Sequence, residues 1–527
     1  MTFGDWLKVL GITLGMVLAM RSLVHYFQLE SYQFPGYYRT LKRNAKRAIL
    51  PGFLLGCTAG VMNTMRMMLG KSTISSAVYA AVVVCIGELI GRLMRDNKAK
   101  KPLNVTPRVK RLYAVSTVVF ALISWGVAAT LGSIWLWVLP VLLPAMVALG
   151  GLCAWPIEKL ISELYFRDAQ RKLKERPDLI KIGITGSYGK TSVKFILGTL
   201  LSEKYQTLVT PSSFNTPMGV TKVIRTKLQP AHQVFVAEMG ARHVGDIKEM
   251  CRLVHPTYGV LTSVGPQHLD TFKTIDRIKK TKYELMDAIP EGGCCFFPND
   301  GAICTELYTA TTKEKRLCSM QADERADVWA ENITVSPEGS SFLLCTKDGK
   351  TPCTTKTLGE HNIQNILLAA TVCFHLGMSA KQIARGIAKV EPVEHRLQIL
   401  PNRGGMTVID DAFNSNPKGS AAALRVLAAF PGRRIIITPG MVELGSGEEE
   451  YNRDFGRQMA ESADVAILVG KRHTEPIVQG LQEKNFLREN IHVVNSLAEA
   501  TTLLNQIGQS GDVVLFENDL PDNYSEQ

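Results

Sequence analysis

The chain has 527 residues, 46% of them hydrophobic, and a formal net charge of +12, so its length predicts several domains. Residues 1–176 hold 23 Lys and Arg against 8 Asp and Glu; the basic character belongs to this first third of the chain and does not indicate nucleic-acid binding. The 11 cysteines are scattered without Cys-x-x-Cys or Cys/His metal spacing. This pattern indicates reduced thiols in a cytoplasmic setting and argues against a disulfide framework or zinc site.

Five apolar stretches fill the first part of the chain, each close to the ~20 residues that a membrane span needs. They are Trp6–Tyr26, Ala48–Leu69, Ser75–Met94, Leu112–Gly132 and Ile134–Trp155. A cleaved signal peptide does not fit the first stretch, because no small-residue cleavage site follows it and further spans come after. The pattern predicts an α-helical membrane domain of about five transmembrane helices over residues 1–156.

Basic residues concentrate in two of the four loops between these stretches, and such loops lie in the cytoplasm. The two sets are Arg39, Lys42, Arg43, Lys46 and Arg47, and then Arg95, Lys98, Lys100, Lys101, Arg108, Lys110 and Arg111. Five spans then place the N-terminus outside and everything after Trp155 in the cytoplasm, as a multi-pass protein of the cytoplasmic membrane. Glu88, inside the third span, is either an ordinary end-of-helix residue or a polar group facing a partner helix or lipid head group.

Residues 157–176 predict an amphipathic juxtamembrane helix. Its apolar positions alternate with lysines and arginines and include Ile157, Leu160, Ile161, Leu164 and Tyr165. This helix either lies on the inner leaflet or simply joins the membrane domain to the next module.

A phosphate-binding loop follows at residues 181–192, which read Lys-Ile-Gly-Ile-Thr-Gly-Ser-Tyr-Gly-Lys-Thr-Ser. A β-branched strand, a Gly-rich turn and a helical pattern point backbone N–H groups and a helix N-terminus at an anion. Lys190 can reach the β/γ-phosphates of a nucleotide, and the Thr191 hydroxyl can ligate Mg²⁺. ATP is therefore expected, although Ile184 replaces the first glycine of the usual motif. The predicted ATP contacts of the loop are Gly186, Ser187, Gly189, Lys190, Thr191 and Ser192.

Beyond the loop, strand patterns alternate with helical ones to the end of the chain, as in α/β domains with parallel sheets. Strand candidates are Val234–Ala237, Gly259–Thr262, Thr407–Ile409, Arg434–Thr438, Val465–Val469 and Val513–Phe516. A break near Val390–Arg396 divides this part into a P-loop central domain, residues 177–393, and a Rossmann-like C-terminal domain, residues 394–527.

Nine motifs in this part resemble, in order, those of the Mur ligases, and above all those of their D-alanyl-D-alanine-adding members. They are Thr185–Ser192; Phe214–Val220; Ala237–Ala241; Val264–Leu269; Lys282–Glu284; Gly359–Asn362 with Asn365; His395 with Arg396; Asp410–Pro417; and Gly440–Gly445. The resemblance implies an ATP-dependent ligase that activates a carboxylate as an acyl-phosphate and joins it to an amine, with two Mg²⁺ ions offsetting the charge.

The resemblance also implies roles for single residues. Thr191 and Glu238 hold one Mg²⁺ ion, and His268 and a carbamylated Lys282 hold the second. The remaining implied site residues are Lys190, Asn215, Thr216 and Arg396 at the reacting groups and Asn362, Asn365, Arg396 and Asp411 at the nucleotide. The alternatives are purely structural roles: a capping or core histidine for His268, a solvated helix lysine for Lys282, and turn residues for Asn414 and Asn416.

Two departures bear on the substrates. Apolar stretches stand where the family carries its UDP-sugar-binding domain, and Phe516–Pro521 occupies the position of an expected Lys-Gly-Ser-Arg. The predicted function is an ATP-dependent amide ligase of peptidoglycan precursor synthesis, acting on a lipid- or UDP-linked muropeptide with an amino acid or dipeptide as the amine. The alternatives are a UDP-MurNAc-tripeptide ligase merely tethered to the membrane, a poly-γ-glutamate or cyanophycin synthetase-like enzyme, and a non-enzymatic membrane scaffold.

Overall fold

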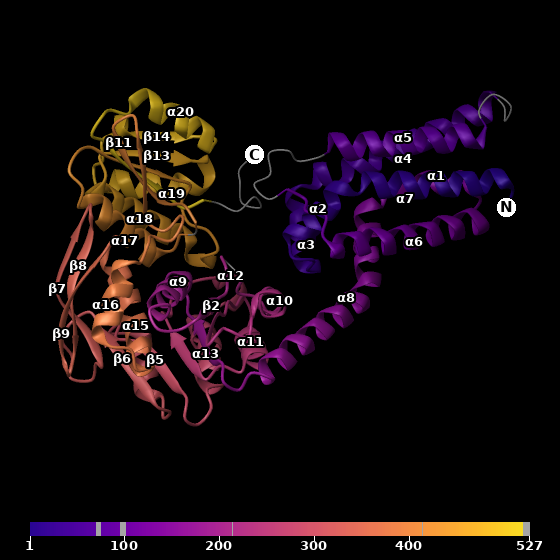
Figure 1. The fold of residues 1–527 in the computed structure, drawn as a ribbon. Helices are drawn as coiled ribbons and strands as arrows, with labels where there is room; N and C mark the ends of the chain where they lie inside the picture. Colours follow the sequence, from indigo (N-terminus) through magenta and orange to yellow (C-terminus); the bar gives the residue numbers. More distant parts are fainter. Residues whose placement is uncertain (70–74, 95–101, 213, 414, 520–527) are drawn as a thin grey trace. The chain divides into compact units, whose positions relative to one another are not determined.

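The structure, a computed structural model, describes residues 1–69, 75–94, 102–212, 214–413 and 415–519 (Figure 1). The chain divides into two compact units, residues 1–164 and 165–527. The predicted basic residues Arg95, Lys98, Lys100 and Lys101 and the candidate Asn414 lie outside the described residues.

The first unit is helical. Its helices are α1 (Phe3–Ala19), α2 (Arg21–Leu29), α3 (Phe34–Arg43), α4 (Ala45–Leu69), α5 (Ser76–Leu93), α6 (Pro107–Thr130), η1 (Ser133–Trp137), α7 (Val138–Val141) and the start of α8 (Leu143–Lys174). Within the described residues, four of them, α4, α5, α6 and α8, are long and apolar enough to cross a membrane. The pair α1 and α2, bent by 44°, makes a fifth candidate if it counts as one span.

The predicted span Ile134–Trp155 is wrong as a single element. The short helices η1 and α7 occupy its first part, and α8 begins only at Leu143. Pro140 and Pro144 lie in the first turns of α7 and α8, the part of a helix that proline favours because it has no N–H to donate. The helix α8 then runs on through Pro156, where the sequence predicts the end of a span.

Close helix packing and a partly buried ion pair hold the first unit together. A Cβ atom on Gly87 of α5 would lie 2.5 Å from the carbonyl oxygen of Gly15 of α1, so only glycine permits this approach of the two helices. Glu158 of α8 accepts a two-pronged hydrogen bond from Arg111 of α6, with Nε–Oε1 and Nη2–Oε2 distances of 2.5 and 2.9 Å. Such bidentate geometry is the strong form of the pair.

The second unit begins with a nine-stranded sheet in the order β2-β3-β1-β4-β5-β6-β7-β8-β9. The strands are β1 (Ile180–Thr185), β2 (Thr207–Val209), β3 (Val234–Glu238), β4 (Tyr258–Leu261), β5 (Cys294–Pro298), β6 (Lys315–Ser319), β7 (Val328–Ser336), β8 (Gly339–Thr346) and β9 (Gly349–Thr355). The strands from β2 to β7 pair in parallel, and β8 and β9 extend the sheet antiparallel.

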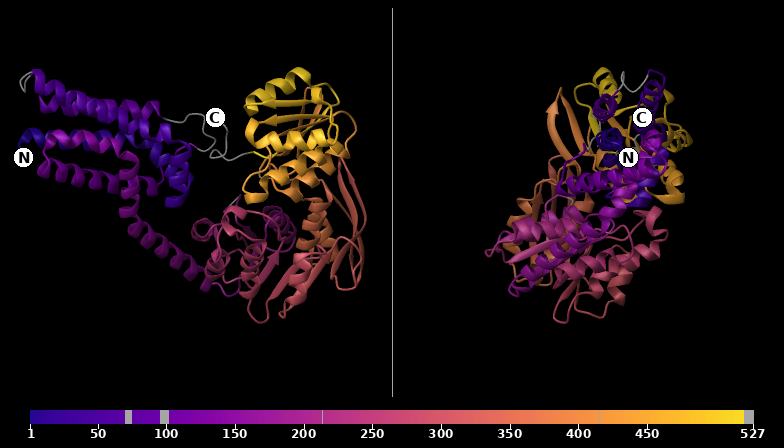
Figure 2. Two further views of the ribbon diagram at one scale, coloured as in Figure 1. Left: turned by 180° about the vertical axis from the view of Figure 1, so that it is seen from behind. Right: turned by 90° about the vertical axis from the view of Figure 1, so that its right-hand side faces the viewer.

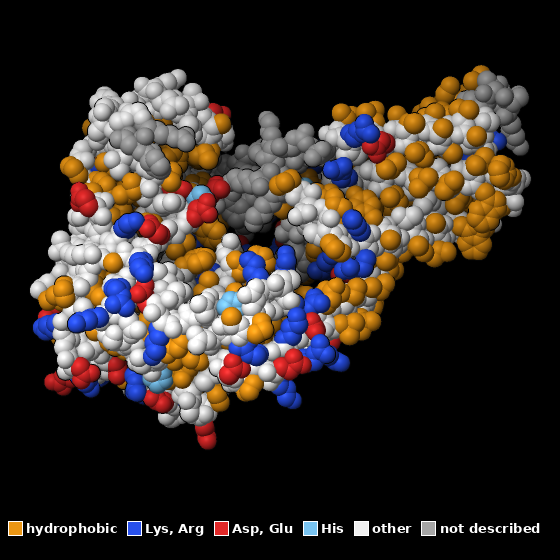
Figure 3. Space-filling view, viewed as in Figure 1, with side chains coloured by type: hydrophobic (Ala, Val, Ile, Leu, Met, Phe, Trp, Pro, Cys, Tyr) orange, Lys and Arg blue, Asp and Glu red, His pale blue; other side chains and the backbone are white. Residues whose placement is uncertain are grey.

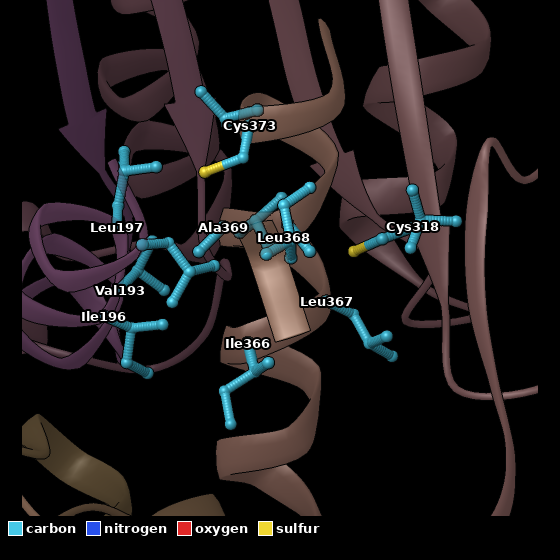
Figure 4. Packing of buried hydrophobic residues seen from close by; sticks show 14 of the residues in the cluster. Val193, Ile196, Leu197, Cys318, Ile366, Leu367, Leu368, Ala369 and Cys373 are labelled. Atoms are coloured by element: carbon cyan, nitrogen blue, oxygen red, sulfur yellow. The ribbon is translucent and has the colours of Figure 1, made fainter. Parts of the chain in front are cut away.

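Helices cover both faces of this sheet (Figures 1 and 2). They are α9 (Lys190–Leu201), α10 (Pro217–Lys227), α11 (Asp246–Val254), α12 (Leu269–Phe272), α13 (Ile275–Asp287), α14 (Ile303–Ala310), α15 (Glu360–His375) and α16 (Ala380–Ala388). The apolar helix α15 packs against α9 on one face, where Leu368 and Ala369 lie near Val193 and Leu197 (Figure 4).

The end of α8 belongs to the core on the other face of the sheet. Phe166, Ala169 and Leu173 are buried among residues of β3, α11 and α13. By contrast, the predicted apolar positions Ile157 and Leu160 are exposed. The amphipathic pattern is therefore shifted along the helix, and its C-terminal part is an integral piece of the α/β unit.

A six-stranded sheet completes the unit in the order β10-β11-β15-β12-β13-β14. Its strands are β10 (Gln398–Arg403), β11 (Met406–Asp411), β12 (Arg434–Thr438), β13 (Val465–Val469), β14 (Ile491–Val494) and β15 (Val513–Glu517), with α17 (Pro417–Ala428), η2 (Gly445–Gly447), α18 (Glu448–Ser462), α19 (Lys471–Glu483), η3 (Arg488–Asn490) and α20 (Leu497–Ile507). All pairings are parallel except β10 with β11. The predicted α/β class is confirmed, and each strand candidate coincides with an observed strand to within a few residues.

Candidate active site

The phosphate loop lies between the end of β1 and the start of α9, and two glycines shape it. Gly186 has φ +152° and a Cβ there would lie 2.1 Å from Thr262 Oγ1, while Gly189 has φ +79° and a Cβ would lie 2.8 Å from Asn365 Oδ1. Tyr188 donates its hydroxyl to the carbonyl of Pro266 at 2.7 Å. The loop is thus fixed from the neighbouring strand end, and the first backbone N–H groups of α9 have no partner within the helix.

The Lys190 side chain folds back over this loop. Its Nζ donates to the carbonyl oxygens of Gly186 and Ser187 at 2.7 and 2.9 Å. Burial lowers the pKa of Lys190 to about 8, with the Glu238 carboxylate opposing that shift and the Arg396 guanidinium adding to it. A desolvated ammonium held by neutral carbonyls is well suited to receive a phosphate.

Glu238 ends β3 and is the centre of a polar cluster. Thr191 Oγ1 lies 3.0 and 3.1 Å from its two carboxylate oxygens, and Asn215 Nδ2 donates to Oε1 at 3.0 Å. Lys194 Nζ pairs with Oε2 at 3.0 Å and also donates to the carbonyl of Ser212 at 2.5 Å. The structure thus brings the predicted residues Thr191, Glu238 and Asn215 together.

Lys282 lies on the buried face of α13 and is only 2% exposed, whereas its neighbour Lys280 is exposed. Within the described residues its ammonium makes no hydrogen bond or ion pair. Burial drives the pKa of Lys282 well below its usual value, the charge of Lys190 lowers it further, and Asp246 and Glu284 act in the opposite direction. The alternative of a solvated helix lysine is therefore wrong.

His268 faces a carboxylate from the six-stranded half of the unit. Its Nδ1 lies 2.5 Å from Oε2 of Glu443. Burial lowers the pKa of His268. The hydrogen bond from His268 lowers the pKa of Glu443. Both residues have left-handed backbones, with φ of 53° and 66°, which is uncommon outside glycine and often found at functional sites.

The predicted nucleotide residues lie on both sides of the loop. Asn365 of α15 lies against Gly189, and its Nδ2 lies 3.4 Å from Asn362 Oδ1. The guanidinium carbon Cζ of Arg396 lies 4.7 Å from the centroid of the Phe413 ring. Burial lowers the pKa of Arg396, and the charges of Asp411 and Glu238 oppose that shift. Burial raises the pKa of Asp411 to about 7.

Several predicted side chains have structural partners. Ser187 Oγ donates to the carbonyl of Gly265 at 3.0 Å, Thr216 caps α10, and Ser192 is buried at the start of α9. Asn416 caps α17, which favours the turn interpretation of that residue.

Sequence reasoning missed three residues near the predicted site residues. Lys194 follows Lys190 by one helical turn, so the spacing alone places it on the same side of α9. Glu443 lies in the motif Gly440–Gly445, but the resemblance implies no role for it. His361 is half-buried at the start of α15, and within the described residues its buried Nδ1 has no hydrogen-bond partner. It lies in the motif Gly359–Asn362, which predicts no role for it.

The sequence matches known protein families in two places. Residues 184–373 match the Mur ligase middle domain, and residues 395–517 match the Mur ligase, glutamate ligase domain. The UDP-N-acetylmuramoyl-tripeptide–D-alanyl-D-alanine ligase of Escherichia coli is 30% identical over 304 residues, which are 57% of this chain and 67% of the relative. The enzyme of that name from Mycobacterium bovis is 32% identical over 297 residues, and this chain spans 57% of its length.

Solved structures agree with these matches. MurF from Acinetobacter baumannii superposes with a TM-score of 0.62 at 27% identity, covering 69% of this chain and 78% of that protein. MurF from Thermotoga maritima, solved in complex with ADP, shares the fold with a TM-score of 0.62 at 22% identity. This chain therefore belongs to the Mur ligase family, and it is an ATP-dependent ligase that forms carbon–nitrogen bonds.

Proposed function

We propose that this Mur ligase activates a carboxylate of a peptidoglycan precursor with ATP and joins it to the amine of D-alanyl-D-alanine, with a lipid-linked acceptor. The names of the relatives suggest the two substrate classes. The observation that carries the proposal is the phosphate loop with Lys190 and Thr191 beside Glu238 and the buried Lys282. In this proposal, residues 1–156 form the membrane domain and residues 157–176 join it to the catalytic part. Residues 177–393 carry the ATP chemistry, and residues 394–527 complete the active site.

The donor set fits magnesium. A carboxylate and a hydroxyl at 3.0 Å from each other are hard oxygen ligands of the kind Mg²⁺ prefers. In this proposal Thr191 and Glu238 hold one ion, and His268 with Lys282 serves the second. The ions would offset the charge of phosphates and carboxylate when bound.

Lys282 is proposed to react with CO₂ at its Nζ, forming a carbamate and releasing a proton. Only the neutral amine can attack CO₂, and a buried lysine without a hydrogen-bond partner among the described residues favours that form. The product is an anion, which the neighbouring charge of Lys190 stabilises. An ammonium has no lone pair for a cation, so the carbamate is what makes Lys282 a metal ligand.

Residues of the two sheets are proposed to act on one reacting centre. Lys190 would bind the phosphates, Asn215 would hold Glu238 in place, and Arg396 would neutralise charge on the transferred phosphoryl group. Asn362, Asn365 and Asp411 would bind the adenosine part. The charge of Arg396 lowers the pKa of Lys190, which supports this arrangement.

The surface of the helical unit supports a membrane location. Hydrophobic side chains cover most of its visible face (Figure 3), and Met67, Leu122 and Leu131 are 72%, 61% and 64% exposed. Apolar exposure on this scale indicates contact with lipid or a partner. We propose that these helices span the cytoplasmic membrane, with the N-terminus outside, the catalytic unit in the cytoplasm, and exposed basic residues such as Arg39 and Arg43 facing lipid head groups.

Reconstitution tests the acceptor. The full chain in phospholipid vesicles would be assayed for ADP release with D-alanyl-D-alanine and either a lipid-linked or a UDP-linked muramoyl tripeptide, using Lys190→Ala as the blank. A higher kcat/KM for the lipid-linked substrate is expected. Equal or better use of the UDP-linked substrate would refute the lipid acceptor and favour a tethered enzyme, and no ADP release with either acceptor would refute the proposed activity.

A further inference from the structure

Three metal-ligating side chains meet at a place remote from the ATP site. Cys294, Glu314 and His375 each offer one ligand atom, and these atoms all lie within 4.8 Å of one another. Cys294 begins β5 and Glu314 directly precedes β6, so the cluster lies at the amino edge of the parallel strands. The phosphate loop follows the carboxyl end of β1, at the opposite edge.

Backbone pairing fixes two of the three positions. Cys295 donates its N–H to the carbonyl of Glu314 at 2.9 Å, which holds Glu314 beside the start of β5. Successive side chains of a strand point to opposite faces. Cys294 accordingly lies in the core formed with α9 and α15, while Cys295 lies in the core on the other face of the sheet.

The third ligand comes from a helix end. His375 is the last residue of α15, and its ring meets Tyr258 and Phe296 edge-on, with centroid separations of 5.3 and 5.4 Å. These contacts hold the imidazole over the strand that carries Cys294. One buried ligand, Cys294, one half-buried ligand, His375, and one exposed ligand, Glu314, converge on one point at the rim of the sheet.

The chemistry of the set indicates the ion. A thiolate, an imidazole and a carboxylate together suit Zn²⁺ better than Mg²⁺ or Ca²⁺. Tetrahedral bonds of about 2.0–2.3 Å put ligand atoms roughly 3.5 Å apart, so small side-chain movements close the site. Arg316 binds Oε1 of Glu314 at 2.9 Å, and an ion would have to compete with it for that carboxylate.

We propose that Cys294, Glu314 and His375 form a zinc-class metal site that braces the end of α15 against β5 and β6. Binding replaces the thiol proton of Cys294, which passes to solvent, with a metal–sulfur bond, and solvent fills the fourth position. Because the first two turns of α15 carry Asn362 and Asn365, the ion stiffens the helix that contacts the phosphate loop. This proposal is independent of the proposed function.

Cobalt provides the direct test, because a Co²⁺–thiolate bond gives a charge-transfer absorption band. The purified full chain, freed of metal by chelation and kept reduced with a phosphine, would be titrated with Co²⁺ in excess Mg²⁺, which occupies oxygen sites. We expect a thiolate band that saturates at one equivalent and that Zn²⁺ abolishes. Zn²⁺ should also raise the thermal unfolding temperature, since binding to the folded state stabilises it.

Neighbouring cysteines give a matched control. Cys294→Ser should abolish the band and the thermal shift, whereas Cys295→Ser, one residue away and equally buried, should keep both. Should Cys294→Ser misfold, His375→Gln decides, because that half-buried residue at a helix end can be replaced without opening the core. It should weaken Co²⁺ binding at least about tenfold, since even indirect partners of metal ligands contribute about 10–100-fold. No band in the wild type, an unchanged band in Cys294→Ser, or unchanged affinity in His375→Gln would overturn the proposal.

Discussion

Replacing Lys194 with methionine should destabilise the α/β unit strongly, because it leaves the Glu238 carboxylate buried without its cation. Lys194 and Glu238 are 0% and 1% exposed, and removing one partner of a buried ion pair costs about 3–5 kcal/mol. Glu238 keeps its contacts with Thr191 and Asn215, so the lower end, about 3 kcal/mol, is expected. At about 2–4 °C per kcal/mol, the unfolding temperature should fall by about 6–12 °C.

Calorimetry of the full chain in detergent measures this shift, and Lys356→Met is the matched control. Lys356 pairs with Glu391, but the two side chains are 62% and 66% exposed, so this pair is worth about 0–1 kcal/mol and its loss should shift the transition by at most about 4 °C. Under the proposed function, Mg²⁺ with ATP should restore more stability to Lys194→Met than it adds to the wild type, because the ion supplies the missing positive charge. Equal shifts for the two variants would refute the reasoning about the buried pair.

Three further outcomes are expected. Lys190→Ala should reduce ADP release to background with an unchanged unfolding temperature, and near-normal turnover would contradict the role of the loop. Lys282→Ala should be nearly inactive and partly rescued by acetate, measured as ADP release over a range of acetate concentrations; full activity without acetate would contradict the carbamate. For Glu517, burial raises the pKa from 4.5 to about 8, so the wild type should lose stability as pH rises from about 4.5 through 8. Glu517→Gln should flatten that part of the curve of unfolding temperature against pH, and parallel curves would contradict the shift.

The α/β part of the fold could be predicted because its strands are short apolar runs between helices. What the sequence did not reveal is the antiparallel extension of the first sheet. The strand β7 is buried on alternate positions only, and β9 contains Pro352, which is tolerated because β9 lies at the edge of the sheet. Such strands lack the continuous apolar run that identifies a buried parallel strand.

In the helical unit, the sequence predicted one continuous span where the structure has several helices. Hydropathy identifies apolar stretches but does not show where helices begin. Pro140 and Pro156 illustrate this, because they lie at different places relative to the helices. Pro140 interrupts the predicted fifth span, while Pro156 lies inside α8. A count of apolar residues does not distinguish these two prolines.

Within the site, residues at strand ends were easier to predict than residues on helices. Glu238 directly follows the strand candidate Val234–Ala237, and the resemblance to the Mur ligases gives it its predicted role. The burial of Lys282 could have been predicted from its register, since it shares the apolar side of α13 with Ile278 and Leu285. Glu314 and His375 follow Cys294 after 20 and 81 residues. This spacing matches no metal motif, because strand pairing and the length of α15 bring these residues together.

The contact between His268 and Glu443 connects the two sheets chemically. A histidine that binds a metal through one nitrogen is usually oriented by a carboxylate on the other, and Glu443 holds Nδ1 of His268 at 2.5 Å. Two left-handed backbones cost roughly 1–3 kcal/mol each, and both are found where the side chains meet. Under the proposed function, Nε2 of His268 is directed toward the second ion only when Glu443 is in place. Under that proposal, the part of the unit that carries Glu443 takes part in assembling the metal site, although the phosphate loop follows β1 of the first sheet.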